Sequence, residues 1–222
     1  MRKSDKCVKN VSIIGGADGP TSIFIAGRIG KGRRPFKVRV KNMLYRQRRR
    51  RIAGRIRPRF HSLKQVAAFM KREYGAVELS WEGLEYQERI AGLKEMLIIQ
   101  NKPELLEGLA EVKHPEEYTK EAMEEMVRQI ERRSEAIARI PDDQLTMDFH
   151  VYQIVIDGGR MEVEIDYLWD VFGISYSGSK KAMKELRKIS CRLYLYYGVT
   201  EEDIKEESKR YSSLLTALAS AD

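Results

Sequence analysis

The feature that most constrains this sequence is the segment 28–60, which contains 15 Lys and Arg and no Asp or Glu. Residues 1–60 together carry 19 basic and two acidic residues, a net charge of +17. The remaining 162 residues carry 22 basic and 31 acidic residues, a net charge of −9. This asymmetry predicts a basic arm joined to a mildly acidic body. Such an arm binds a polyanion or folds back on its own acidic body.

The composition of the arm predicts nucleic acid as its partner, or else another polyanion such as an acidic protein surface. Arginines neutralise phosphates and release counterions, and Phe36, Tyr45 and Phe60 are interleaved where they can stack on unpaired bases. We expect about residues 40–56 to become helical on binding. The alternatives are a solvated, disordered arm, an arm neutralised by the glutamates of 116–135, and contact with an anionic membrane surface. The predicted contact residues are Arg33, Arg34, Arg46, Arg48, Arg49, Arg50, Arg51, Arg55, Arg57 and Tyr45.

Beyond residue 60 the patterns predict an α+β fold that is mostly helical. Runs of β-forming residues around Asp157-Gly158-Gly159 predict a β-hairpin over about 145–167, with Gly158 and Gly159 as its two-residue turn. We expect a short strand at 76–80 and a helical segment at 166–172. Apolar spacing and capping signals predict helices at about 62–75, 82–100, 115–140 and 179–197, and one that starts at Thr200.

These patterns divide the sequence into a Gly-rich apolar motif segment with a short strand (1–27), an Arg-rich arm or linker (28–61) and the α+β body (62–222). Two cysteines are too few for a disulfide framework, which predicts a reduced, cytoplasmic protein. A membrane-spanning helix needs about 20 mostly apolar residues. The longest stretch without a charged residue is 211–221, so we expect a soluble protein with no transmembrane segment.

The motif segment contains "SIIGGADGPTSIFIAG", residues 12–27, in which two apolar runs flank a break. The glycines permit backbone conformations that other residues avoid, and Pro20 fits the first turn of a following helix. Asp18 lies at the break, where exposed backbone groups and one carboxylate suit a small cation. A phosphate held by free N–H groups is the alternative.

Over about residues 11–30 this stretch, "GGADGPTSIF", resembles the β-subunits of sodium-ion-translocating decarboxylases, which act on oxaloacetate, methylmalonyl-CoA or glutaconyl-CoA. The rest of the chain does not match these many-span membrane proteins. The resemblance implies that Asp18 takes part in sodium binding. It implies a soluble relative or remnant of such a subunit, with Na⁺ as the one cofactor to consider. The implied cation-site residues are Gly15, Gly16, Asp18, Gly19, Pro20 and Thr21.

Two other places in the sequence contain charged residues that could bind an ion. Glu162, Glu164 and Asp166 alternate along the second hairpin strand, where three carboxylates can bind a divalent cation or form a solvated face. We expect no metal in the leading interpretation, and a small metal-dependent enzyme is the second alternative. Lys180 and Lys181 follow a serine-rich turn that can hold an anion or simply cap a helix.

Taken together, the sequence predicts a non-enzymatic binding protein whose arm contacts nucleic acid or another polyanion. No catalytic residue can be named. A regular apolar seam predicts that 200–219 packs against another helix, with self-association as one outcome. The seam residues are Ile204, Ser208, Tyr211, Leu215 and Leu218.

Overall fold

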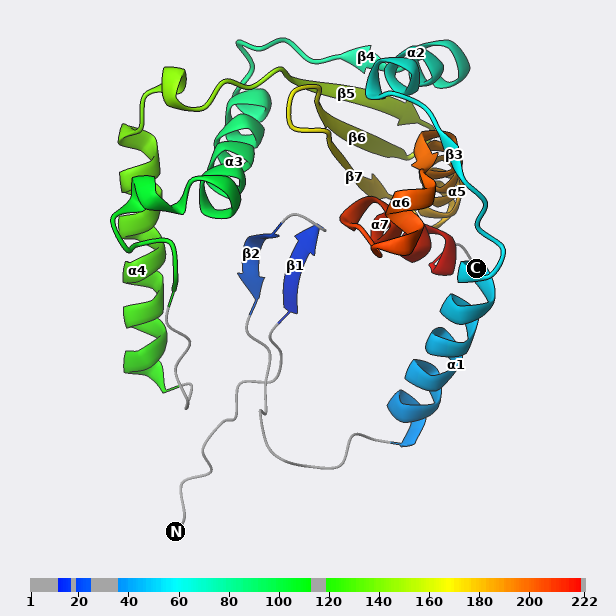
Figure 1. The fold of residues 1–222 in the computed structure, drawn as a ribbon, viewed down its shortest axis with the longest axis horizontal. Coiled ribbons are helices and arrows are strands. Elements are labelled where there is room, and N and C mark those ends of the chain that lie inside the picture. Colours follow the sequence, from blue (N-terminus) through cyan, green and yellow to red (C-terminus); the bar gives the residue numbers. More distant parts are fainter. Residues whose placement is uncertain (1–11, 17–18, 25–35, 113–118, 221–222) are drawn as a thin grey trace. The chain divides into compact units, whose positions relative to one another are not determined.

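The computed structural model describes residues 12–16, 19–24, 36–112 and 119–220. Its helices and antiparallel sheets confirm the predicted α+β class (Figure 1). The chain divides into two compact units, which we describe separately. Unit 1 comprises residues 1–78, 151–165 and 170–222, and unit 2 comprises 79–150 and 166–169. The helices of the described residues include none long and apolar enough to cross a membrane.

Unit 2 is built on two helices, α3 (Leu84–Asn101) and α4 (Lys120–Arg139), with short 3₁₀ turns at Pro103–Leu106 and Asp142–Gln144. Both helices were predicted, and Thr119 caps the start of α4 by accepting a hydrogen bond from the N–H of Ala122. Residues 113–118, which include the predicted start of this helix, lie outside the described residues. The buried side chains of the unit include Leu93, Leu97, Ile98, Leu106, Met126, Ile137 and Leu145.

The main sheet has four antiparallel strands in the order β4 (Val77–Glu78), β5 (Phe149–Ile156), β6 (Gly159–Asp166) and β7 (Val171–Gly178). The predicted hairpin is β5 and β6, and the short strand at 76–80 is β4. Helices α2 (Leu63–Tyr74) and α5 (Lys180–Tyr197) belong to the same unit, and α5 contacts both β7 and α2. The buried face of the hairpin is apolar, as the alternation predicts, with Tyr152, Ile154, Met161, Val163 and Ile165 at 2% exposure or less.

The structure corrects the sequence interpretation of the hairpin in two places. The turn consists of Asp157 and Gly158, with φ of 72° at Gly158, so it lies one residue earlier than predicted. Gly159 is needed for packing instead, because a Cβ atom there would lie 2.7 Å from the Cβ of Ala182 on α5. The expectation of a helix at 166–172 is wrong, because β7 begins at Val171 after a turn.

The basic arm forms a helix, α1 (Phe36–Ala53), followed by a short strand, β3 (Arg59–Phe60). Strand β3 pairs antiparallel with β8 (Gly198–Val199). The helix expected from Thr200 is two helices, α6 (Glu201–Lys205) and α7 (Lys209–Ala219). Ser208 separates them, because its side chain caps α7 by accepting a hydrogen bond from the N–H of Tyr211.

The glycine motif forms an antiparallel hairpin of β1 (Ser12–Gly16) and β2 (Gly19–Phe24). Ile13 pairs with Ile23, and Gly15 pairs with Pro20. The expectation that Pro20 opens a helix is therefore wrong. The register shift between Ile14 and Gly15 places the irregularity next to this proline, which cannot donate a ladder hydrogen bond.

Candidate polyanion interface

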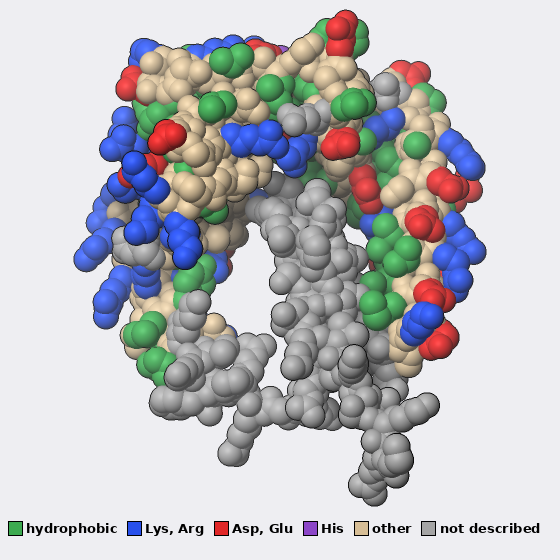
Figure 2. All heavy atoms as spheres, turned by 180° about the vertical axis from the view of Figure 1, so that it is seen from behind, with side chains coloured by type: hydrophobic (Ala, Val, Ile, Leu, Met, Phe, Trp, Pro, Cys, Tyr) green, Lys and Arg blue, Asp and Glu red, His purple; other side chains and the backbone are tan. Residues whose placement is uncertain are grey.

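Helix α1 concentrates positive charge on the surface of unit 1. Its 18 residues include eight Lys and Arg and no acidic residue. Arg46, Arg50 and Arg51 are exposed, and Arg48 and Arg49 are half-buried. The two arginines of the last turn, Arg50 and Arg51, lie where the helix dipole favours cations. Figure 2 shows Lys and Arg side chains along the left edge of its view, over this helix.

The C-terminal end of α1 is held by a small hydrophobic core. Ile52 and Ala53, together with Ile56 just beyond the helix, pack against the buried residues of α7 and β8. Arg48 Nη2 donates a hydrogen bond to the carbonyl oxygen of Leu218 at 3.4 Å. The arm is thus a preformed helix packed on the body, whereas the sequence predicted that it becomes helical on binding. The buried residues of this core are Val199, Tyr211, Leu214 and Leu215.

Most described arginines of the basic arm have no hydrogen-bond or ion-pair partner for their side chains within the described part of the chain. The side chains of Arg46, Arg49, Arg50, Arg51 and Arg55 form no hydrogen bond or ion pair with any described residue. Repulsion among these guanidinium groups is therefore not relieved by any described carboxylate. A polyanion that supplies negative charge is the ligand class that would relieve it.

Several basic side chains of α4 in unit 2 show the opposite arrangement, because they form ion pairs with glutamates of the same helix. Lys120 lies 3.7 Å from Glu124, and Arg128 lies 3.0 Å from Glu125. These contacts are spaced three or four residues apart, the distance at which oppositely charged side chains meet on a helix. Glu124 and Glu125 are thus paired with basic residues on the same helix.

The charge of the protein follows the division into units. Unit 1 carries 32 Lys and Arg and 15 Asp and Glu, which gives a net charge of +17. Unit 2 carries nine Lys and Arg and 18 Asp and Glu, which gives a net charge of −9. Without residues 1–60, unit 1 carries 13 basic and 13 acidic residues. Residues 1–60 therefore supply the whole excess positive charge of unit 1, and the basic arm at 28–60 supplies most of it.

Arg210 on α7 anchors the end of the arm to the body. Its Nε–H donates to the carbonyl oxygen of Gly198 at 2.9 Å, and Nη2 donates to those of Tyr197 and His61, both at 3.1 Å. The guanidinium lies 3.4 Å from the ring centroid of Tyr197 and 4.3 Å from that of Phe60. One largely buried side chain thus joins β8 to the end of β3. The role of Arg210 is not predicted from the sequence, because nothing local distinguishes this residue from the other arginines.

The tyrosine beneath Arg210 is itself fixed by a carboxylate. The Tyr197 hydroxyl donates to Asp170 Oδ2 at 3.0 Å, and Arg210 Nη1 lies 3.6 Å from the same oxygen. Burial raises the pKa of Tyr197 well above its ordinary value, and Asp170 adds to that increase while Arg210 opposes it. The group is therefore a neutral hydrogen-bond donor at physiological pH.

The predicted contact residues differ in their surroundings. Arg33 and Arg34 lie outside the described residues. Arg57 Nη1 donates to the carbonyl oxygens of Gly54 and Ile56, so this guanidinium is turned onto its own backbone. Tyr45 is 38% exposed, which leaves much of its ring accessible.

The residues of the proposed cation motif are only partly placed. Gly15, Gly16, Gly19, Pro20 and Thr21 lie in the strands of the β1–β2 hairpin, and Asp18 lies outside the described residues. Sodium binding and the resemblance to decarboxylase β-subunits stay predictions.

Two of the three hairpin carboxylates, those of Asp166 and Glu162, are buried and form contacts within the fold. Asp166 is fully buried and accepts hydrogen bonds from the backbone N–H groups of Asp148, Leu168 and Trp169. Glu162 is buried, with Oε1 3.5 Å from Arg160 Nε. These two carboxylates do not form the solvated face considered above. The described residues contain no group of three His, Cys, Asp or Glu able to hold a metal ion.

The other predicted interaction concerns the apolar seam of 200–219. Tyr211 and Leu215 are buried inside unit 1 in the core that holds α1. The predicted helix packing is therefore found within the chain. Self-association through this segment stays a prediction, and it would have to use the side chains that this core leaves exposed.

Comparison with known proteins gives no match to a family model, to a curated protein or to a solved structure.

Proposed function

We propose that this chain is a non-enzymatic, cytoplasmic binding protein whose helix α1 binds the phosphates of nucleic acid. The observation that carries the proposal is the row of arginines on α1 without partners in the described part of the chain. Phosphate oxygens accept charge-assisted hydrogen bonds from guanidinium groups, and each neutralised phosphate releases a counterion. Binding of this kind depends on charge and is independent of the base sequence.

The packing of α1 supports the proposal, because the helix is formed before any ligand arrives. A segment that orders on binding must lose conformational entropy at that moment, which lowers its affinity. Here the contacts of Ile52, Ala53 and Ile56 with the core hold the C-terminal end of α1 in place before the ligand binds. Tyr45 adds an aromatic ring beside the arginines, suited to an unpaired base. A cytoplasmic location fits the buried free thiol of Cys191.

Fluorescence anisotropy across a salt series tests the proposal. The α1 variant replaces Arg46, Arg49, Arg50 and Arg51 with Gln. If all four contact phosphates, the variant lowers the slope of log affinity against log salt by about 3 to 4.

The α4 control removes the same charge from unit 2 by replacing Lys120, Arg128, Arg132 and Arg139 with Gln. All four side chains are exposed, and the control is expected to keep the wild-type slope. Equal slopes for wild type and the α1 variant would reject α1 as the binding surface. An equal loss in both variants would show that only net charge matters.

A further inference from the structure

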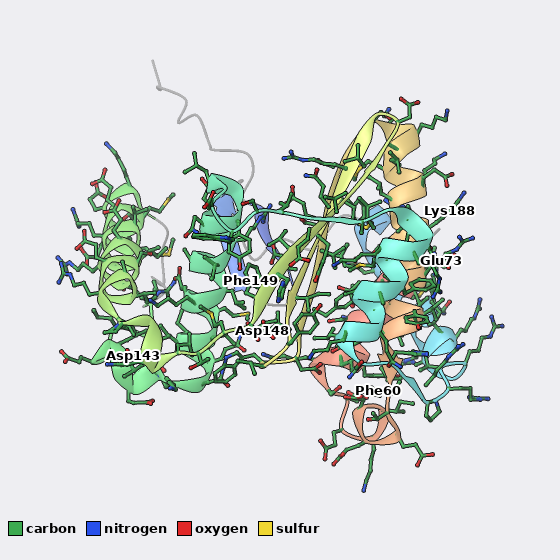
Figure 3. All side chains as sticks on the ribbon, turned by 90° about the horizontal axis from the view of Figure 1, so that it is seen from above. Phe60, Glu73, Asp143, Asp148, Phe149 and Lys188 are labelled. Atoms are coloured by element: carbon green, nitrogen blue, oxygen red, sulfur yellow. The ribbon has the colours of Figure 1, made fainter. Side chains whose placement is uncertain are left out.

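A second basic surface lies on helix α5 of unit 1. The helix is capped by Ser179, whose side chain accepts a hydrogen bond from the N–H of Ala182. One face is buried and includes Leu186 and Leu193. Figure 3 shows Lys188 on this helix pointing away from the ribbon. The opposite face exposes five basic side chains, Lys180, Lys181, Lys184, Lys188 and Arg192.

Within the described residues, this surface is almost without counter-charge. Glu185 is the one acidic residue of α5, and its Oε1 lies 2.9 Å from Lys188 Nζ. The side chains of Lys180, Lys181, Lys184 and Arg192 form no hydrogen bond or ion pair with a described residue.

The arrangement is unfavourable for the isolated helix. Lys180 and Lys184, Lys184 and Lys188, and Lys188 and Arg192 are like-charged pairs four residues apart, a spacing that destabilises a helix. Lys180 and Lys181 also lie in the first turn, where the helix dipole disfavours cations. Neutralisation by a bound polyanion would remove both penalties.

The aromatic residues of α5 are already engaged and offer no stacking platform for bases. Tyr194 makes an edge contact with Phe172, at a centroid distance of 5.1 Å. Tyr196 is stacked between His61 and Phe69, at 4.0 and 4.2 Å. Tyr197, the remaining aromatic residue of α5, lies beneath the guanidinium group described above. Without free aromatic rings, this helix can contact phosphates but cannot hold unpaired bases.

The basic faces of α1 and α5 belong to the same unit, and both helices pack against α7. From Lys181 to Arg192 the exposed row on α5 extends about 16 Å along the helix axis. A nucleic-acid duplex carries one phosphate charge per about 1.7 Å of its axis, so it presents many phosphates over this length.

From these observations we infer that α5 is a second binding surface, which contacts the phosphate backbone of a nucleic-acid duplex. The inference rests on the proposed function in one respect, because it assumes that unit 1 binds nucleic acid. It adds a second binding surface to the protein and a preference for duplex over single-stranded nucleic acid. The α1 helix, with Tyr45, accepts single strands or duplexes. The α5 helix adds more affinity for duplexes, because a duplex presents twice as many phosphate charges per unit length as one strand and α5 has no stacking surface for unpaired bases.

The α5 variant replaces Lys181, Lys184, Lys188 and Arg192 with Gln, and circular dichroism checks that it is folded. Its affinity is measured by anisotropy for a duplex of about 20 base pairs, two helical turns, for a single strand of equal length, and for heparin. We expect duplex affinity to fall about tenfold or more, with a slope lower by about 3 to 4. Single-strand and heparin affinities should change much less.

Each other outcome is decisive. An unchanged duplex affinity would overturn the α5 surface, even if the α1 variant has lost binding. An equal fall for duplex, single strand and heparin would overturn the duplex preference. If only the α5 variant loses binding, the proposed function of α1 fails and the α5 surface stands. Failure of the wild type to bind any probe at low salt would reject both proposals.

Discussion

The guanidinium of Arg210 lies 3.4 Å from the ring centroid of Tyr197, and its N–H groups donate to three backbone carbonyl oxygens. Its side chain is only 10% exposed. Two of these oxygens belong to the α5–β8 junction and the third belongs to His61, at the end of the arm. The contact therefore helps to join the end of the basic segment to the body, beside the hydrophobic core that holds α1.

We expect Arg210→Ala to lower the free energy of unfolding by about 2 to 4 kcal/mol. The substitution removes the donors to the part-buried carbonyl oxygens of Gly198 and His61, and leaves that of Tyr197 with only the His61 N–H. Arg210→Lys should rescue little, since an ammonium group cannot supply the planar array of donors or the ring contact. Urea denaturation measures both variants. Arg192→Ala, an exposed arginine with no side-chain partner in the described part of the chain, is the control, expected within about 0.5 kcal/mol of wild type. A small effect of Arg210→Ala would show that β3–β8 pairing does not need this anchor.

Gly198→Ala should disrupt the same junction through the backbone. Gly198 has a φ of 66°, and an added Cβ would lie only 1.7 Å from the carbonyl oxygen of Arg59. Because the clash is with backbone, β3 must separate from β8, and we expect a loss of more than about 3 kcal/mol in thermal or urea unfolding. Gly92→Ala is the matched control. Gly92 lies inside α3, and apart from the neighbouring backbone of that helix no atom lies within 4 Å of the added Cβ, so that variant should gain up to about 1 kcal/mol.

The elements that the sequence predicts well are those with local signals. Three of the capping signals behind the predicted helices occur in the structure: the capping box of Ser62 and Gln65, Gly75 at the end of α2, and the capping box of Thr200 and Asp203. Each motif involves residues three or four positions apart, or one residue with a left-handed backbone. Such signals are complete within one turn of chain.

The features that the sequence does not predict depend on contacts between distant segments. Gly159 fits the pattern of a turn residue, but its role is fixed by Ala182 on another element. Arg210 cannot be distinguished from other arginines until His61 and Tyr197 are placed beside it. The basic face of α5 could have been found earlier, since its row from Lys181 to Arg192 is a simple helical periodicity.

Asp166→Ala tests whether the buried hairpin carboxylate is structural. The substitution leaves the N–H groups of Asp148, Leu168 and Trp169 without their acceptor. We expect a loss of about 2 to 4 kcal/mol in urea unfolding, and a smaller loss for Asp166→Asn, which keeps one acceptor oxygen. Asp143→Ala, at an exposed position, serves as the control and should be close to neutral. A neutral Asp166→Ala variant would contradict this structural role.

The capping box at the start of α6 should make stability depend on pH in the acid range. Burial acts to raise the pKa of Asp203, but hydrogen bonds from Ser208 and Thr200 and the charge of Arg210 outweigh it, so the pKa lies below its ordinary value. A depressed pKa in the folded state means that the stabilisation is fully present above the unfolded pKa, about 3.9, and is lost as pH falls through the folded value. Urea unfolding between pH 2 and 6 should therefore show Asp203→Asn less stable than wild type at pH 6, with the difference shrinking below about pH 4. A difference that stays constant over this range would show that ionisation of Asp203 is not involved.

A charge-preserving version of the α1 variant separates electrostatic binding from specific recognition. Replacing Arg46, Arg49, Arg50 and Arg51 with Lys keeps every positive charge but removes the bidentate donor geometry of guanidinium. Because the proposed contacts are to phosphates, anisotropy should give a salt slope equal to wild type and an affinity within about threefold, whereas the Gln version loses both. A Lys version that binds as poorly as the Gln version would contradict charge-driven phosphate binding, because it would show that α1 needs the arginine geometry to recognise its ligand.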